Sequence, residues 1–292
     1  MSVIGNLVLV FVAGLLTALA TGLGAIPFFF VEEFSDRWNV ALWGTASGIM
    51  VSASLFGLFN EGLTYTTGVP TMLLGGILAG VVLVELSDRL LDGVDIGGAD
   101  SVDDGAGRAQ TDGAGVDESR LEANAFAEGD PKKLLLILGI LTVHSFPEGV
   151  AVGVSFAELG LGGGVPVFGF AVPVLAVFMT VAISIHNVPE GTAIAIPMRA
   201  MGLSKWRMVG AAVFSSLPQP VGAVIAFAFV RWAQSFLPFG YGFAAGAMVY
   251  LVFTEFIPEA LETGADLPDG GWRALLTGFV AGAAVMVPLL LV

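Results

Sequence analysis

Two copies of one hexapeptide hold both histidines of the chain: HSFPEG over residues 144–149 and HNVPEG over residues 186–191. In each copy the histidine and the glutamate are four residues apart, so His144 with Glu148, and His186 with Glu190, share a helix face. Imidazole nitrogens and carboxylate oxygens suit Zn²⁺, Fe²⁺, Mn²⁺ or Cd²⁺, and the absence of cysteine excludes thiolate ligands. We predict that these four side chains converge on one divalent metal ion.

The surroundings of the two copies favour a metal over other uses. Both lie inside apolar stretches, where an ionised carboxylate costs at least ~2.5 kcal/mol and needs a partner. His144 follows Lys133 by about 16 Å of helix, and His186 lies midway between Pro173 and Arg199, so both reach the middle of a bilayer. Two alternatives remain open: histidine–glutamate hydrogen bonds within a packed bundle, and a proton relay through the same residues.

The composition is that of an all-α membrane protein. Hydrophobic residues make up 56% of the chain and charged residues 12%, and the apolar runs exceed the roughly 20 residues that cross a hydrocarbon core. Eight transmembrane helices are predicted. They run approximately over Val3–Phe30, Val40–Phe59, Val69–Leu86, Lys133–Phe156, Val167–Pro197, Met208–Trp232, Pro238–Ala260 and Trp272–Val292.

Three regions follow from this division. Residues 1–88 hold the first three helices, and residues 133–292 hold helices four to eight of the same membrane domain. Residues 89–132 form an acidic, Gly/Ala-rich segment, predicted to be a disordered cytoplasmic loop that either solvates itself or weakly attracts metal. No nucleotide motif is present, so neither ATP-driven transport nor a nucleic-acid partner is expected.

The basic residues predict how the chain is threaded. In an eight-helix arrangement every Lys and Arg except Arg231 falls on one side, and basic residues near helix ends stay in the cytoplasm. The prediction is therefore a multi-pass plasma-membrane protein with both termini outside.

The duplicated H-x-x-P-E-G on consecutive helices resembles the ZIP (Zrt/Irt-like) family of divalent-metal transporters, in its prokaryotic GufA-like branch. The segments ATGLGAIPFFF (20–30), GIMVSASLFGL (48–58), SSLPQPVGA (215–223) and AGAMVYLVFTEFIPEA (245–260) extend the similarity. The resemblance implies a 3+2+3 arrangement, in which helices one to three and six to eight form an inverted repeat about helices four and five. It also implies that helices one, four, five and six move against the other four.

Site residues can be assigned from this resemblance. The first metal position would use His144, Glu148, His186 and Glu190. The family builds an adjacent second position with an asparagine, a polar or acidic residue and a further glutamate, where this chain has Ser145, Asn187 and Gln219. Because a neutral glutamine replaces a charged ligand, we predict that the second position is empty or weakly filled.

A path through the membrane can also be assigned. Glu61 would attract cations at the entrance and Ser54 would line the way inward, although small-residue packing also explains Ser54. Glu255 and Glu259 would form the exit, although Glu259 also fits an interfacial position.

The expected function is transport of Zn²⁺, Fe²⁺, Mn²⁺ or Cd²⁺ into the cytoplasm by alternating access, with no prosthetic group and no enzyme activity. The rival is an intramembrane zinc-dependent hydrolase. The sequence leaves a homodimer open.

Overall fold

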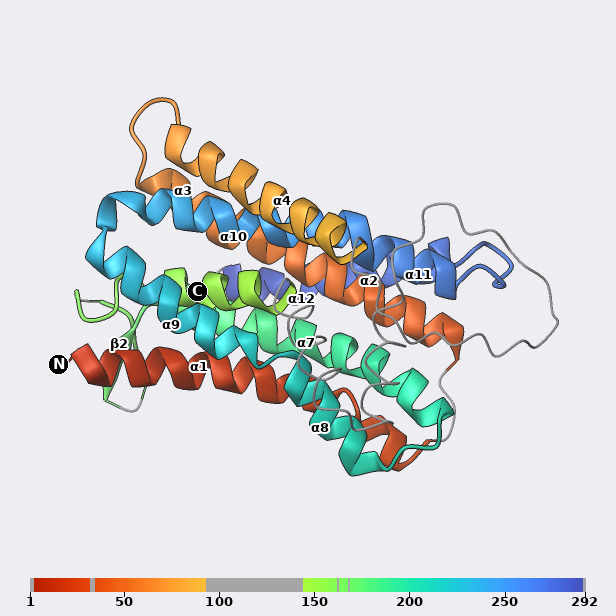
Figure 1. Cartoon of the computed structure of the whole chain (residues 1–292). Helices are drawn as coiled ribbons and strands as arrows, with labels where there is room; N and C mark the ends of the chain where they lie inside the picture. Colours follow the sequence, from red (N-terminus) through yellow and green to blue (C-terminus); the bar gives the residue numbers. More distant parts are fainter. Residues whose placement is uncertain (1–2, 32–34, 93–143, 162, 168, 291–292) are drawn as a thin grey trace.

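The computed structural model describes residues 3–31, 35–92, 144–161, 163–167 and 169–290 (Figure 1). The predicted acidic loop from residue 93 onward and residues 133–143 of the predicted fourth helix lie outside these ranges. The described helices and strands are α1 (Val3–Leu23), η1 (Ile26–Phe29), α2 (Asp36–Ser52), η2 (Ala53–Phe59), α3 (Asn60–Thr64), α4 (Thr71–Asp92), the helix over residues 144–155, β1 (Val165–Val167), β2 (Phe170–Val172), α7 (Val174–Ala200), α8 (Lys205–Ser215), α9 (Pro218–Trp232), η3 (Gln234–Phe236), α10 (Leu237–Leu251), η4 (Val252–Phe256), α11 (Ile257–Thr263) and α12 (Trp272–Leu290).

These helices build a multi-pass bundle. Five are long and apolar enough to cross a membrane: Val3–Leu23, Asp36–Thr64, Val174–Ala200, Lys205–Trp232 and Gln234–Thr263. Two shorter apolar helices, Thr71–Ser87 and Trp272–Val287, and the helix over residues 144–155 complete the eight positions predicted from the sequence. The prediction of an all-α membrane protein is confirmed.

Three predicted boundaries were wrong. The first helix ends at Leu23 rather than Phe30, because a separate 3₁₀ turn, η1, follows it. The fifth helix begins at Val174 rather than Val167, because Val165–Val167 and Phe170–Val172 pair as a short antiparallel hairpin and Pro173 caps the helix. The sixth predicted helix has the expected bounds but is broken between Ser215 and Pro218, where LPQP cannot continue the α8 hydrogen bonds. The third continues to Asp92, six residues beyond the predicted Leu86.

Two helix crossings relate the halves of the chain. α2 packs on α12, and α4 packs on α10, in each case through glycines four residues apart on both helices. A Cβ added at any of these glycines would clash with a carbonyl oxygen of the facing helix; they are Gly44, Gly48, Gly76, Gly80, Gly242, Gly246, Gly278 and Gly282. An inverted repeat carries the second helix onto the seventh and the third onto the eighth, so each crossing maps onto the other.

The second and seventh helices share another irregularity. Each contains a π-helical segment, η2 over Ala53–Phe59 and η4 over Val252–Phe256, at corresponding places in the two repeats. An extra residue in a turn of a transmembrane helix rotates the side chains that follow and is common at functional sites. Both segments face α7, since Gly57 approaches Phe178, and Phe256 contacts His186.

The bundle is apolar outside and partly polar inside. Exposed leucines and valines cover the outer faces of α1, α4 and α12, whereas the buried polar residues include Thr17, Ser54, Asn187, Ser216 and Gln219. This distribution matches a protein in lipid, where the outer surface meets acyl chains and polar groups find partners inside.

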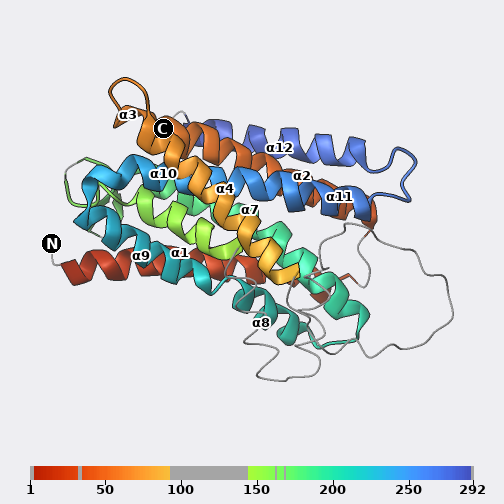
Figure 2. The same cartoon turned by 45° about the horizontal axis from the view of Figure 1, so that its top comes forward.

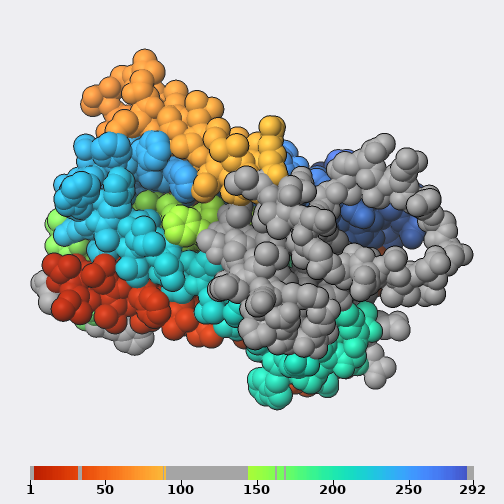
Figure 3. All heavy atoms as spheres, viewed as in Figure 1, coloured from red at the N-terminus to blue at the C-terminus, as the bar shows by residue number. Residues whose placement is uncertain are grey.

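The two termini lie toward the same end of the bundle. Two views differing by 45° show the start of α1 and the end of α12 toward the end of the bundle that holds the α9–α10 connection, and the α7–α8 and α11–α12 connections toward the opposite end (Figures 1 and 2). The space-filling view shows α1, α9, α10 and α4 forming the described surface of one face (Figure 3). An even number of crossings accounts for this shared end.

Candidate metal site

Four helices surround the candidate site, and glycines of the two hexapeptides let them approach. Gly149, on the helix over residues 144–155, lies against the backbone of Gln219 in α9, and Gly191 in α7 lies against the backbone of Thr21 in α1. A Cβ at either glycine would clash with the facing carbonyl oxygen. Close packing at these glycines brings the side chains that precede them, Glu148 and Glu190, into the same space.

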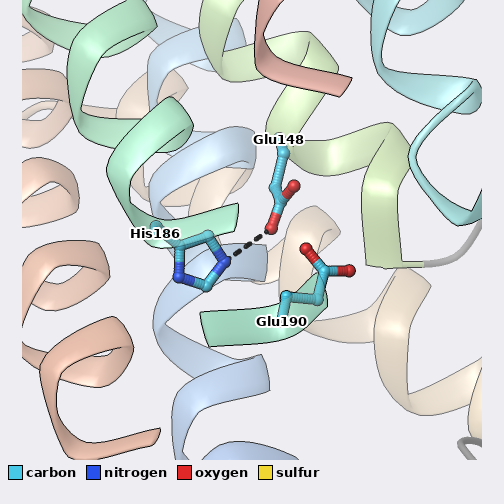
Figure 4. A group of neighbouring side chains, drawn as sticks. All are labelled: Glu148, His186 and Glu190. Atoms are coloured by element: carbon cyan, nitrogen blue, oxygen red, sulfur yellow. Dashed lines mark hydrogen bonds and ion pairs between the residues drawn. The ribbon is translucent and has the colours of Figure 1, made fainter. Parts of the chain in front are cut away.

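Glu148, His186 and Glu190 form the candidate metal group (Figure 4). One ligand atom from each lies within 4.8 Å of the others. His186 Nε2 is 3.1 Å from Glu148 Oε1, and the side chains of these two residues are 0% and 3% exposed. Glu190 lies one turn after His186 on α7 and is half-buried. A cation that replaces the histidine–carboxylate hydrogen bond would find two carboxylates and one imidazole facing it.

The start of α9 lies beside the Glu148 carboxylate. The break before Pro218 places the amino-terminal end of α9 beside this carboxylate, and Gln219 Nε2 donates a hydrogen bond to Glu148 Oε2. The amino-terminal end of a helix carries partial positive charge and stabilises a nearby anion. The sequence pointed to the LPQP segment but did not indicate that the start of α9 contacts Glu148.

Amide hydrogen bonds occupy the predicted second position. Asn187 Nδ2 donates to Gln219 Oε1 at 3.0 Å and to the Thr17 carbonyl oxygen at 2.8 Å. Ser145 Oγ donates to the Ser215 carbonyl oxygen at 3.1 Å. All three side chains predicted for this position are therefore buried and engaged in hydrogen bonds with protein atoms.

His144 lies apart from the group formed by the other three predicted ligands. Its Nε2 is 2.7 Å from Oε1 of Glu255 in η4, a residue expected on the exit path. The two side chains are 12% and 29% exposed, so this contact is less buried than the contact between His186 and Glu148. The structure thus brings His144 together with Glu255, a pairing that the sequence did not indicate.

A polar cleft of about 250 Å³ lies beyond the site at the far end of the helix over residues 144–155, toward the end of the bundle that holds the termini. Glu61, Ser155, Glu158 and Tyr241 are among its lining residues. Ser155 is seven residues beyond Glu148, or about 10 Å of helix. Glu61 was predicted at the entrance; Glu158 was not singled out, although it is an acidic residue at a helix end.

Tyr65 fixes one carboxylate of this cleft. Its hydroxyl donates a hydrogen bond to Glu158 Oε1 at 2.6 Å. Burial raises the pKa of the Tyr65 hydroxyl well above its usual value, and the hydrogen bond to Glu158 raises that pKa further. The hydroxyl therefore remains a hydrogen-bond donor at neutral pH.

The remaining predicted path residues lie in the two irregular helices. Ser54 is fully buried in η2, and its hydroxyl has no hydrogen-bond partner among the described residues. Glu259 is half-buried on α11, four residues after Glu255. Their positions fit the predicted path.

A family profile and several named relatives match most of this chain. The profile described as ZIP zinc transporter matches residues 4–290. The chain belongs to this family. A relative in Myxococcus xanthus named zinc transporter GufA is 30% identical over 277 residues, covering 92% of this chain and 94% of the relative. Zinc transporter ZIPB of Bordetella bronchiseptica is 31% identical over 268 residues, covering 92% and 76%.

A plant protein adds a third comparison. It comes from Arabidopsis thaliana, carries a provisional zinc-transporter name, and is 36% identical over 251 residues, which cover 84% of this chain and 33% of the relative. This ZIP chain thus spans about a third of the plant protein's length. Family membership confirms the resemblance drawn from the hexapeptides and assigns the chain to membrane transporters rather than enzymes.

Proposed function

We propose that this ZIP protein carries Zn²⁺ across the plasma membrane into the cytoplasm. The single observation that carries the proposal is the buried group of Glu148, His186 and Glu190, whose ligand atoms lie within 4.8 Å of one another. Two carboxylates in an apolar bundle repel each other and lose hydration, and a divalent cation offsets both costs. Two carboxylates with one imidazole also accept Fe²⁺, Mn²⁺ and Cd²⁺, so these remain candidate substrates.

His144 completes the site as a fourth ligand in this proposal. It lies one turn before Glu148 on the same helix, so the two side chains share a face. If His144 Nε2 left Glu255 and bound the metal instead, Zn²⁺ would have the four ligands that it favours. The contact with Glu255 then represents the arrangement before His144 binds metal.

Alternating access to this site is supported by the two sets of packed helices. The helix over residues 144–155 packs on α9, and α7 packs on α1, through Gly149 and Gly191. α2 with α12, and α4 with α10, pack through their own glycine pairs. Each set is held together by backbone contacts, so relative movement is concentrated between the sets. The metal ligands lie on the first set and face the second, where Phe256 contacts His186 and Glu255 contacts His144.

The ends of the path follow from the acidic residues. Zn²⁺ enters through the cleft lined by Glu61 and Glu158, passes Ser54, and leaves past Glu255 and Glu259. The alternative of a zinc-dependent hydrolase has less support, because both glutamates of the group serve as ligands and neither is left to act as a general base.

Zn²⁺ flux into proteoliposomes tests the function. Purified protein should accumulate Zn²⁺ down a concentration gradient without ATP or an added organic substrate, and Cd²⁺ should compete. The matched control is the His186→Ala, Glu190→Ala variant in the same liposomes, which should match protein-free vesicles. Wild-type vesicles that accumulate no more Zn²⁺ than this control would contradict transport.

Orientation has its own test, because the basic side of the bundle is proposed to face the cytoplasm. Arg37, Arg199 and Arg273 lie near the ends of α2, α7 and α12 at one end of the bundle, and Arg231 lies in the last turn of α9 at the other. An epitope at either terminus should react with antibody on intact cells, and one inserted near Gly113 only after permeabilisation. The opposite labelling pattern would reverse the proposed direction.

A further inference from the structure

An aromatic side chain from the seventh helix lies flat against the metal-site histidine. The rings of Phe256 and His186 have centroids 5.3 Å apart and an angle of 17° between their planes. Phe256 is the last residue of η4, and it directly follows Glu255, which contacts His144. The π-helical turn therefore presents consecutive side chains to the two hexapeptide histidines.

Trp43 of α2 also contacts this ring. Its centroid is 5.0 Å from that of Phe256, the two planes are inclined at 52°, and both residues are 8% exposed. Phe256 therefore contacts an aromatic ring on α2 as well as the imidazole on α7, and this close packing leaves it little freedom to turn.

The second nitrogen of His186 lacks the usual support. In most metal sites the ring nitrogen that does not bind metal donates a hydrogen bond, which fixes the orientation of the imidazole. His186 Nδ1 is buried and has no hydrogen-bond partner among the described residues. Beside the contact of Nε2 with Glu148, the stack with Phe256 constrains the plane of the ring.

We propose that Phe256 is a positioning residue for metal binding, which holds the His186 imidazole by ring stacking in the plane that directs Nε2 at the cation. The proposal rests on the proposed function, since it assumes that His186 binds the transported metal. Phe256 belongs to the set formed by α2, α4, α10 and α12. His186 belongs to the set formed by α1, the helix over residues 144–155, α7 and α9. Relative movement of the two sets would therefore break the stack. Phe256 therefore favours the metal-binding arrangement in which the two sets are in contact.

Phe256→Leu tests this role, because it keeps an apolar side chain and removes the ring. Zn²⁺ binding to the purified full-length protein, measured by calorimetry, should weaken roughly three- to tenfold, and the KM for uptake should rise with little change in maximal rate. Phe256→Tyr keeps the ring and should bind within about twofold of wild type. Phe253→Leu is the matched control in the same turn, where the side chain is 62% exposed, and should leave affinity unchanged.

A double-mutant cycle separates positioning from simple packing. His186→Gln keeps a polar side chain but has no ring to stack, so Phe256→Leu should not weaken Zn²⁺ binding further in that background. An equal loss in both backgrounds, or wild-type affinity in Phe256→Leu, would overturn the proposal. Wild-type protein that binds no Zn²⁺ would instead overturn the proposed function and this inference with it.

Discussion

Zn²⁺ uptake is expected to fall at least roughly 100-fold when both carboxylates of the metal group are removed by Glu148→Ala together with Glu190→Ala. The two glutamates supply the negative charge of the group, and His186 and the proposed fourth ligand His144 would remain. Imidazoles alone hold Zn²⁺ weakly in an apolar interior, because the cation would lose its hydration without gaining charge compensation.

The response of stability to Zn²⁺ distinguishes a lost site from a lost fold. Without metal, the double variant loses the repulsion between two carboxylates and also the acceptor of the hydrogen bonds from His186 and Gln219, so it should still unfold cooperatively but melt somewhat below metal-free wild type. Wild type should gain stability on adding Zn²⁺, as any ligand that binds the folded state confers, and the double variant should not. Thermal unfolding in detergent with and without Zn²⁺ measures both quantities.

The matched control for this pair is Glu262→Ala. Glu262 is exposed on α11 and should leave uptake and the Zn²⁺-induced stabilisation unchanged. Transport at the wild-type rate by the Glu148→Ala, Glu190→Ala protein would show that the metal crosses elsewhere in the bundle.

The single variant Glu148→Ala is informative in a different way. It removes the acceptor of the hydrogen bonds from His186 and Gln219, so those buried groups would lack that partner. The two glutamates therefore differ in their surroundings. Glu148 is buried and accepts hydrogen bonds from two neighbours, whereas Glu190 is half-buried.

Periodic and compositional features of the chain made the fold predictable. Apolar runs long enough to cross a bilayer gave the helices, and the repeated hexapeptide gave Glu148, His186 and Glu190, since four-residue spacing fixes a helix face without knowledge of tertiary packing. The boundaries were less predictable. The hairpin over residues 165–172 is as apolar as a helix end, so hydropathy alone could not separate it from α7.

Contacts between distant apolar residues left no local signal. In the sequence, Phe256 cannot be distinguished from any other phenylalanine of a transmembrane helix. Its stack on His186 depends on a π-helical turn, which no residue type predicts. His144 was predicted beside Glu148 because the spacing allows it. Its contact with Glu255, 111 residues away, depends on how the seventh helix packs against the fourth.

A second metal ion is expected to bind when Gln219 is changed to glutamate, raising the stoichiometry from about one to about two. Gln219 is fully buried, donates to Glu148 Oε2 and accepts a hydrogen bond from Asn187. A carboxylate at this place can no longer donate to Glu148, and it brings a third negative charge beside Glu148 and Glu190. The repulsion is relieved by a cation between residues 148 and 219, which supplies what the amide hydrogens of Gln219 provide in the wild type.

This change also predicts how stability will depend on metal. Metal-free Gln219→Glu should melt below wild type because of the added buried charge, and saturating Zn²⁺ should stabilise it by more than it stabilises wild type. Gln219→Met, which has similar volume and neither charge nor amide, is the control and should stay at one ion. Crystals soaked in Cd²⁺ decide the matter: one anomalous peak in wild type and two about 4 Å apart in Gln219→Glu are expected. Two peaks of comparable height in wild type would show that amide and hydroxyl ligands suffice, and that the charge at position 219 does not control occupancy of the second position.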